Sequence, residues 1–156
     1  MSTYAMAFLM GVVAGLRSMT APAAVSWAAR LGWLHLGNTW LAFLGAAITP
    51  YILSVVAVGE LINDKLPKTP SRKAPMPFAV RLVVGAACGA ALGEQSGALI
   101  GGLVCGVLGA VAGTLGGYEA RTRAARAIGG KDLPIALLED AVAVCGAACI
   151  VLQFRS

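Results

Sequence analysis

Long apolar segments that carry almost no charge constrain the fold of this chain more than any other feature. Residues 97–117 contain no Asp, Glu, Lys or Arg, and several other segments are nearly as apolar. A run of about 20 such residues is long enough to cross the hydrocarbon core of a bilayer as a helix. Only 12% of the residues are charged, roughly half the share of a soluble domain. We therefore expect one all-α integral membrane domain over residues 1–156.

The apolar pattern predicts a polytopic bundle of about five transmembrane helices. Pro50 lies near the centre of the second expected span, where a proline removes a backbone donor and kinks a helix. The loops at 64–73 and 119–131 are too polar to lie in lipid. The expected spans cover residues 4–29, 40–62, 77–92, 97–117 and 133–154.

The first of these segments is interrupted by Arg17 and Pro22. Residues 4–16 alone rise only about 20 Å as a helix, less than the hydrocarbon thickness. We therefore expect a broken first helix. A re-entrant first segment, with four full spans, is the alternative that the sequence leaves open. Because residues 1–3 carry no Lys or Arg, we expect this segment to be retained rather than cleaved as a signal peptide.

Positive charge is distributed unevenly between the two sides of the predicted bundle. The loops at 64–73 and 119–131 carry eight Lys and Arg residues, whereas the opposite side carries only Arg30 and Arg155. Cytoplasmic loops are enriched in Lys and Arg. With five spans, this places the protein in the cytoplasmic membrane with its N-terminus in the cytoplasm and its C-terminus outside. Positive charge confined to such loops gives no reason to expect nucleic-acid binding.

Glycine recurs every four residues in the middle of the chain, as at Gly85, Gly89 and Gly93 and again at Gly109, Gly113 and Gly117. Small residues at this spacing let helices in lipid approach closely. The third and fourth spans are therefore expected to pack as a tight hairpin or across a homodimer.

A weak internal repeat is also present. Residues 10–15 resemble residues 108–113, and each copy is followed by an Ala-Ala-Arg triplet and then by a pair of acidic residues. Because the first and fourth of five spans cross in opposite directions, this pattern predicts an inverted repeat of two helices.

Six charged residues lie inside or at the edge of the apolar spans. A charge at the bilayer centre costs about 2.5–3.5 kcal/mol on insertion scales, so each needs a partner, water or a function. Glu60 and Asp64, four residues apart, face one side of a helix, and two neighbouring carboxylates suit the handling of a proton or cation. The six candidate site residues are Arg17, Glu60, Asp64, Arg81, Glu139 and Asp140.

Two interpretations of these charges stay open. In the first, Arg17 and Arg81 neutralise the acids or hold an anionic group while Glu139 and Asp140 bind a cation or proton, as in a transporter or channel-like binder of a small solute or ion. In the second, the same charges form a buried ion-pair clamp in a structural or regulatory protein, whose basic loops bind anionic lipid or a partner. Both make the lipid bilayer the first partner.

The sequence predicts neither an enzyme nor a cofactor. It contains no nucleophile elbow, zinc-binding helix motif, phosphate-binding loop or dinucleotide fingerprint. The four cysteines lie within apolar stretches without the paired spacing or histidines of a zinc site, so we expect no metal.

Several of these motifs together resemble a known membrane family. They are Gly15-Leu16-Arg17-Ser18, Glu60-Leu61, Asp64-Lys65-Leu66-Pro67, Pro70-Ser71-Arg72, Arg81, Gly117-Tyr118 and Leu138-Glu139-Asp140-Ala141. The combination resembles the family known as domain of unknown function 4126, from about residue 5 to residue 150. The resemblance implies a small multi-span membrane protein without an assigned activity.

Overall fold

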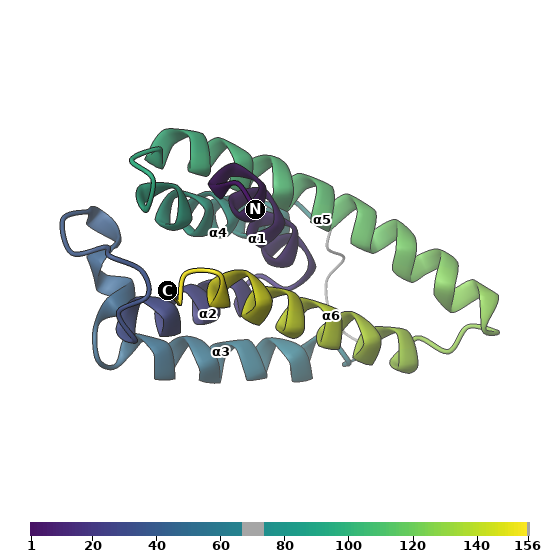
Figure 1. Cartoon of the computed structure of the whole chain (residues 1–156). Coiled ribbons are helices and arrows are strands. Elements are labelled where there is room, and N and C mark those ends of the chain that lie inside the picture. Colours follow the sequence, from purple (N-terminus) through teal and green to yellow (C-terminus); the bar gives the residue numbers. More distant parts are fainter. Residues whose placement is uncertain (67–73, 156) are drawn as a thin grey trace.

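The computed structural model describes residues 1–66 and 74–155, and the ordered elements in these ranges are all helices (Figure 1). Residues 67–73 of the expected polar loop and Ser156 lie outside the described residues. The elements are α1 (Thr3–Leu16), α2 (Thr20–Arg30), the 3-10 helix η1 (Trp40–Gly45), α3 (Thr49–Asn63), α4 (Pro75–Glu94), α5 (Leu99–Ala127) and α6 (Leu133–Leu152).

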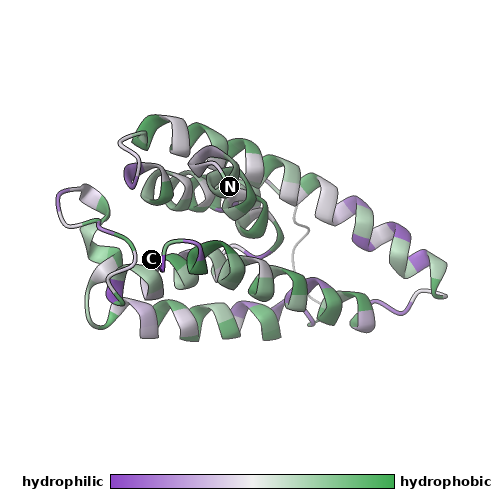
Figure 2. Ribbon diagram, viewed as in Figure 1, coloured by the Kyte–Doolittle hydropathy of each residue, from purple (hydrophilic) through white to green (hydrophobic). Residues whose placement is uncertain are grey.

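Three of the described helices, α4, α5 and α6, are long and apolar enough to cross a membrane, and α1 and α3 are shorter apolar helices. Large apolar side chains point outward from the long helices, such as Val83, Ile100 and Leu138, which are 68%, 76% and 62% exposed. Hydrophobic residues cover most of the ribbon in Figure 2, and the hydrophilic residues gather at the turns and along the last turns of α5. A contiguous apolar exterior of this kind belongs to a membrane protein.

Helices α4 and α5 form an antiparallel hairpin in direct backbone contact. Gly85 and Gly89 of α4 lie against Gly106 and Gly102 of α5, and a Cβ atom on Gly106 would overlap the carbonyl oxygen of Gly85. Only glycine leaves room for this approach, which gives the two helices van der Waals contact in place of a hydrophobic driving force.

Helix α1 lies on the same glycine-rich helix. Gly109 of α5 packs against the backbone of Phe8, and Gly113 packs against that of Val12. The order of these contacts shows that α1 and α5 run in the same direction, which does not fit an inverted repeat of the two segments. These glycines face α1 and α4 of the same chain. They are therefore not available as the homodimer interface that the glycine pattern suggested.

The first segment breaks and turns back on itself. Helix α1 ends at Leu16 and α2 begins at Thr20. Helix α2 then runs antiparallel to α3, because Ser18 contacts Glu60 near the end of α3 and Trp27 bonds Ser54 near its start. Tyr4 near the start of α1 packs against Gly101 near the start of α5, and His35 after α2 contacts Gln95 just after α4. Both ends of the first segment therefore lie at the same end of the bundle.

We call this the terminal end, because both chain termini lie there. Met1 and Gln153 line one pocket, and the backbone N–H of His35 donates to Gln95 in the turn between α4 and α5. The opposite end, the basic end, carries the residues after α3, the start of α4 and the turn between α5 and α6. The sequence analysis expected the two termini on opposite sides of the bundle, whereas in the structure both lie at one end.

Two expected spans differ from the structure. Residues 40–62 do not form one kinked helix: η1 ends at Gly45, and Pro50 lies in the first turn of α3, where the missing backbone donor has no intrahelical partner to lose. Helix α5 does not end near Gly117 but continues to Ala127. The basic residues that the sequence placed in a loop are helical as far as Ala127.

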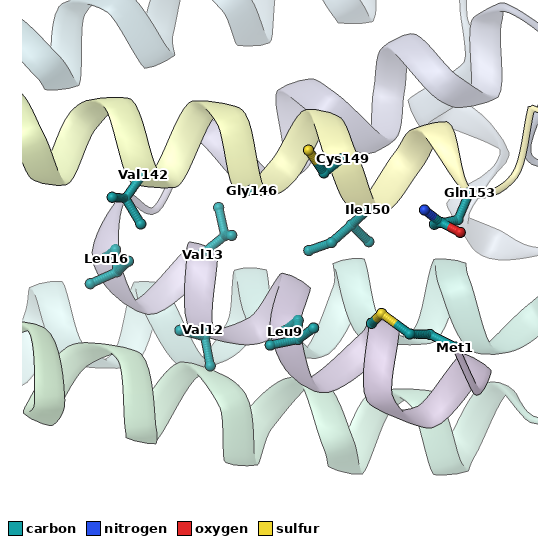
Figure 3. Close-up of a pocket in the computed structure, with 10 residues that line it drawn as sticks. All are labelled: Met1, Leu9, Val12, Val13, Leu16, Val142, Gly146, Cys149, Ile150 and Gln153. Atoms are coloured by element: carbon teal, nitrogen blue, oxygen red, sulfur yellow. The ribbon is translucent and has the colours of Figure 1, made fainter.

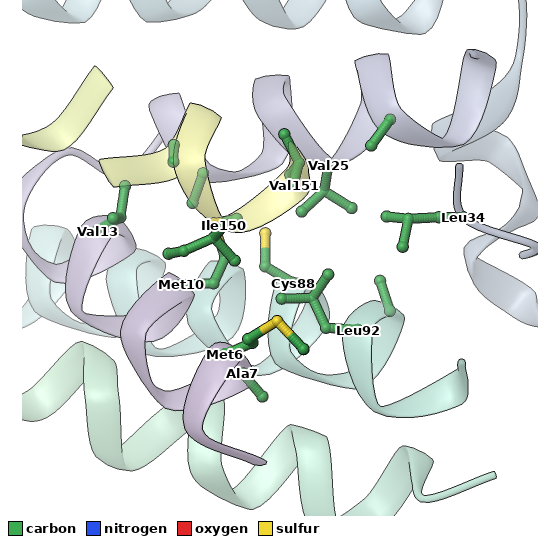
Figure 4. Close-up of a cluster of buried hydrophobic side chains, with 14 of the residues drawn as sticks. Met6, Ala7, Met10, Val13, Val25, Leu34, Cys88, Leu92, Ile150 and Val151 are labelled. Carbon is green, nitrogen blue, oxygen red and sulfur yellow. The ribbon is translucent and has the colours of Figure 1, made fainter. Parts of the chain in front are cut away.

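The core lies between α1, α2, α4 and α6, toward the terminal end (Figure 4). Met10 and Leu92 are fully buried, and Cys88 is 1% exposed. Together with Val25 and Ile150 they fill the space between the pair α1 and α2 and the long helices α4 and α6.

The close backbone contact between α4 and α5 predicts that Gly106→Ala destabilises the protein by about 1–3 kcal/mol, because the added methyl group forces the helices apart. Gly116→Ala is the matched control: a Cβ there meets nothing within 4 Å and should leave stability unchanged or raise it by up to about 1 kcal/mol. Thermal unfolding in detergent measures both. Equal unfolding temperatures for the two variants would contradict the packing described.

Candidate functional site

The structure brings all six predicted charged residues to the break between α1 and α2. They form two groups joined by residues 15–19: Glu60 and Arg81 contact the backbone of the break, and the others surround the Arg17 side chain. Lys65 and Arg121 join the second group. We call these eight residues the charge cluster: Arg17, Glu60, Asp64, Lys65, Arg81, Arg121, Glu139 and Asp140.

Arg81 binds the carbonyl groups that the end of α1 leaves free. Its Nη1 donates to the carbonyl oxygens of Gly15 and Leu16, the latter at 3.1 Å. The Thr114 hydroxyl of α5 also donates to Gly15, at 3.3 Å. A positive charge at the C-terminus of a helix is favourable because the last carbonyls carry partial negative charge.

Glu60 binds the free backbone N–H groups just before α2, as Arg81 binds the free carbonyl groups at the end of α1. Its carboxylate accepts hydrogen bonds from the backbone N–H groups of Ser18 and Met19 at 2.9 and 2.8 Å, and from the Ser18 hydroxyl at 2.6 Å. Arg81 lies 3.9 Å from the same carboxylate. Both free ends of the broken helix are therefore bound by a charge of the appropriate sign.

The Arg17 side chain is fully buried and binds carboxylates from two other parts of the fold. Its Nη1 lies 2.5 Å from Asp64, which follows α3 directly, and its Nε donates to Asp140 of α6 at 2.6 Å. Its Nη2 contacts Asp140 and lies 4.0 Å from Glu139. These pairs join the break to α3 and α6 through side chains alone.

Sequence reasoning missed Lys65 and Arg121, which it counted as loop residues. The Lys65 ammonium lies 2.6 Å from Asp140, and Arg121 Nη1 lies 2.7 Å from Asp64 and 3.6 Å from Glu139. A signal for Arg121 was present, because the four-residue repeat that runs through Gly113 and Gly117 reaches Arg121 at its next step. That step keeps Arg121 on the inward face of a helix that continues past Gly117.

The formal charges of the cluster balance. Four cations, Arg17, Lys65, Arg81 and Arg121, stand against four acids, Glu60, Asp64, Glu139 and Asp140. The carboxylates surround guanidinium and ammonium groups, and within the described ranges no group of three or more His, Cys, Asp or Glu residues is arranged to hold a metal ion. The arrangement suits the exchange of one ion pair for another.

The cluster is unevenly exposed. The side chains of Lys65 and Glu60 are 24% and 19% exposed, whereas that of Arg17 is 0% exposed. Toward the terminal end the apolar core around Met10 and Cys88 lies beyond the cluster (Figure 4). The exposed part of the cluster therefore lies toward the basic end, and Arg17 is enclosed.

Comparison of the chain with protein-family models, curated proteins and solved structures found no match. The resemblance to the family known as domain of unknown function 4126 therefore stays a prediction from the sequence motifs.

The contacts of Glu60 predict that Glu60→Gln lowers the free energy of unfolding by about 1.5–3 kcal/mol, because a neutral amide replaces a charged acceptor at the start of α2. The control is Glu119→Gln, since the Glu119 side chain is 53% exposed and pairs with Arg123 one helical turn away. That change should cost less than about 0.5 kcal/mol. Chemical unfolding in mixed micelles compares them, and equal losses would contradict the capping role.

Proposed function

We propose that this protein binds and moves a small ion or small charged solute across the cytoplasmic membrane. Its site would be Arg17 with the three carboxylates around it, those of Asp64, Glu139 and Asp140. The observation that carries the proposal is a fully buried guanidinium, bound by carboxylates, at the break between α1 and α2. Broken helices and ionisable residues inside a membrane characterise the binding sites of transporters.

The two groups of cluster residues make different contacts, and this difference supports the proposed function. Glu60 and Arg81 already satisfy the backbone at the break. Asp64, Glu139 and Asp140 meet Arg17 only through side chains, so the need to cap the helix ends does not explain them. Ion pairs of this kind can open in two ways. A proton or a bound cation can replace Arg17 on a carboxylate, or a bound anion can replace a carboxylate on Arg17.

The topology that we propose has four crossings, the three long helices α4 to α6 and the shorter α3, with α1 and α2 entering and leaving at the terminal end. The excess of Lys and Arg in the sequence at 64–73 and 119–131 supports a cytoplasmic location for the basic end. Both termini are then outside, whereas our sequence analysis expected a cytoplasmic N-terminus. The solute enters the cluster from the cytoplasm.

Release to the other side requires the core to open. Helix α3 is the best candidate for the moving element, because it packs against α2 and η1 and leaves Val55 and Ile62 72% and 61% exposed. A shift of α3 with α2 would separate the Arg17–Asp64 pair from Asp140 of α6 and part the core side chains around Val25. Rocking of one helix group against another is a common form of alternating access.

A second candidate function is a structural or regulatory membrane protein whose cluster only clamps the helices. The observation that favours it is the complete balance of four cations and four acids in the cluster. In that case the basic loops would be the active surface, binding anionic lipid or a partner.

Asp140→Asn separates the two candidates, because it removes the charge that both Arg17 and Lys65 bind. Purified wild type in liposomes should exchange at least one member of a panel of protons, alkali cations, halides and small carboxylates. The variant should lose at least about 90% of that flux, as expected for a site charge inside a membrane, while it stays monodisperse and helical.

Glu119→Gln is the matched control and should keep the wild-type flux. Absence of flux for every member of the panel, with an Asp140→Asn protein that unfolds readily, would contradict transport and favour the clamp.

A further inference from the structure

A long apolar groove runs beside α6 toward the charge cluster. Its first part, of about 320 Å³, lies between α1 and α6, and its second part, of about 240 Å³, lies between α5 and α6. Leu16 and Val142 line both parts, so the two parts adjoin at these side chains. Figure 3 shows Val142 and Ile150 on α6 facing Leu16 and Leu9 on α1 across the first part. We call this space the α6 groove.

The walls of the groove differ along its length. Aliphatic side chains line the first part, with Gln153 at the terminal end. Small residues of α5, Gly117, Ala120 and Ala124, face Ile135 and Leu138 of α6 in the second part. Interiors of proteins are close-packed, so an open apolar channel of this length in a membrane is a place for hydrocarbon.

Charge enters the groove only near the basic end. Arg121 and Glu139 line its second part, and the Nε and Nη2 atoms of Arg121 both donate to the carboxylate of Asp132. The side chain of Asp132 is 54% exposed, whereas that of Arg121 is only 16% exposed. A fork of two guanidinium N–H groups binds a phosphate with the same geometry as a carboxylate.

We propose that the α6 groove binds one acyl chain of an anionic phospholipid, whose phosphate takes the place of Asp132 on the Arg121 fork. The apolar walls fit the chain, and the position of Arg121 fits a headgroup at the basic end, where the exposed Lys131 adds positive charge. The proposal depends on the membrane location of the protein and not on transport.

Lipid retention in native mass spectrometry tests this proposal on the detergent-purified protein. With phosphatidylglycerol and phosphatidylcholine of identical chains added in equal amounts, the wild type should retain phosphatidylglycerol preferentially. Val142→Trp fills the groove and should weaken this retention on the order of tenfold, by excluding several methylene groups. Val144→Trp, at an exposed position of α6 outside the groove, should retain the lipid as the wild type does.

Asp132→Asn tests the headgroup contact separately. Loss of the competing carboxylate should tighten the binding of phosphatidylglycerol more than that of phosphatidylcholine, because both lipids carry the phosphate but the choline ammonium also loses a nearby negative charge. All variants are first compared with the wild type by size-exclusion chromatography and helicity. Equal retention of the two lipids by the wild type, or equal retention by the two Trp variants, would overturn the proposal. So would a lipid-free dimer that only Val142→Trp dissociates, since the groove would then bind a second copy.

Discussion

The backbone groups at the break of the first helix must find hydrogen-bond partners in the buried interior of the bundle. In such a place an unsatisfied N–H or C=O group costs several kcal/mol. Arg81 from α4 and Glu60 from α3 supply these partners, and the contacts fix where α3 and α4 stand relative to α1 and α2. The reversal of the chain at Arg17 therefore depends on charges that are far away in the sequence.

That constraint also determines what else the bundle contains. The break places Arg17 where α3 and α6 bring carboxylates, and α5 adds Arg121. The charges thus form one connected cluster that opens at the basic end, while glycine contacts hold α1, α4 and α5 together around it. Arg121 belongs both to this cluster and to the mouth of the α6 groove, so the proposed solute site and the proposed lipid site share a side chain.

Sequence reasoning located α4 and α6 to within a few residues and found six of the eight cluster residues, because apolar length and misplaced charge are local properties. Pro50 was misinterpreted because a proline in an apolar run can begin a helix as well as kink one. Hydropathy marks the edge of a membrane rather than the end of a helix, so the last turns of α5 and with them Arg121 were missed. Hydropathy also does not show whether a segment crosses the bundle or turns back. The return of α2 beside α3 depends on long-range contacts with Glu60 and Ser54.

The central claim is that the first segment enters and leaves at one end of the bundle. Labelling of single cysteines by a membrane-impermeant maleimide in sealed right-side-out vesicles tests it most directly, with the four native cysteines replaced. If both termini lie outside, Ser2→Cys and Arg155→Cys are labelled in intact vesicles and Lys131→Cys is labelled only after permeabilisation. Labelling of Ser2→Cys only after permeabilisation, together with Lys131→Cys, would rule out this topology and favour a first segment that crosses the membrane.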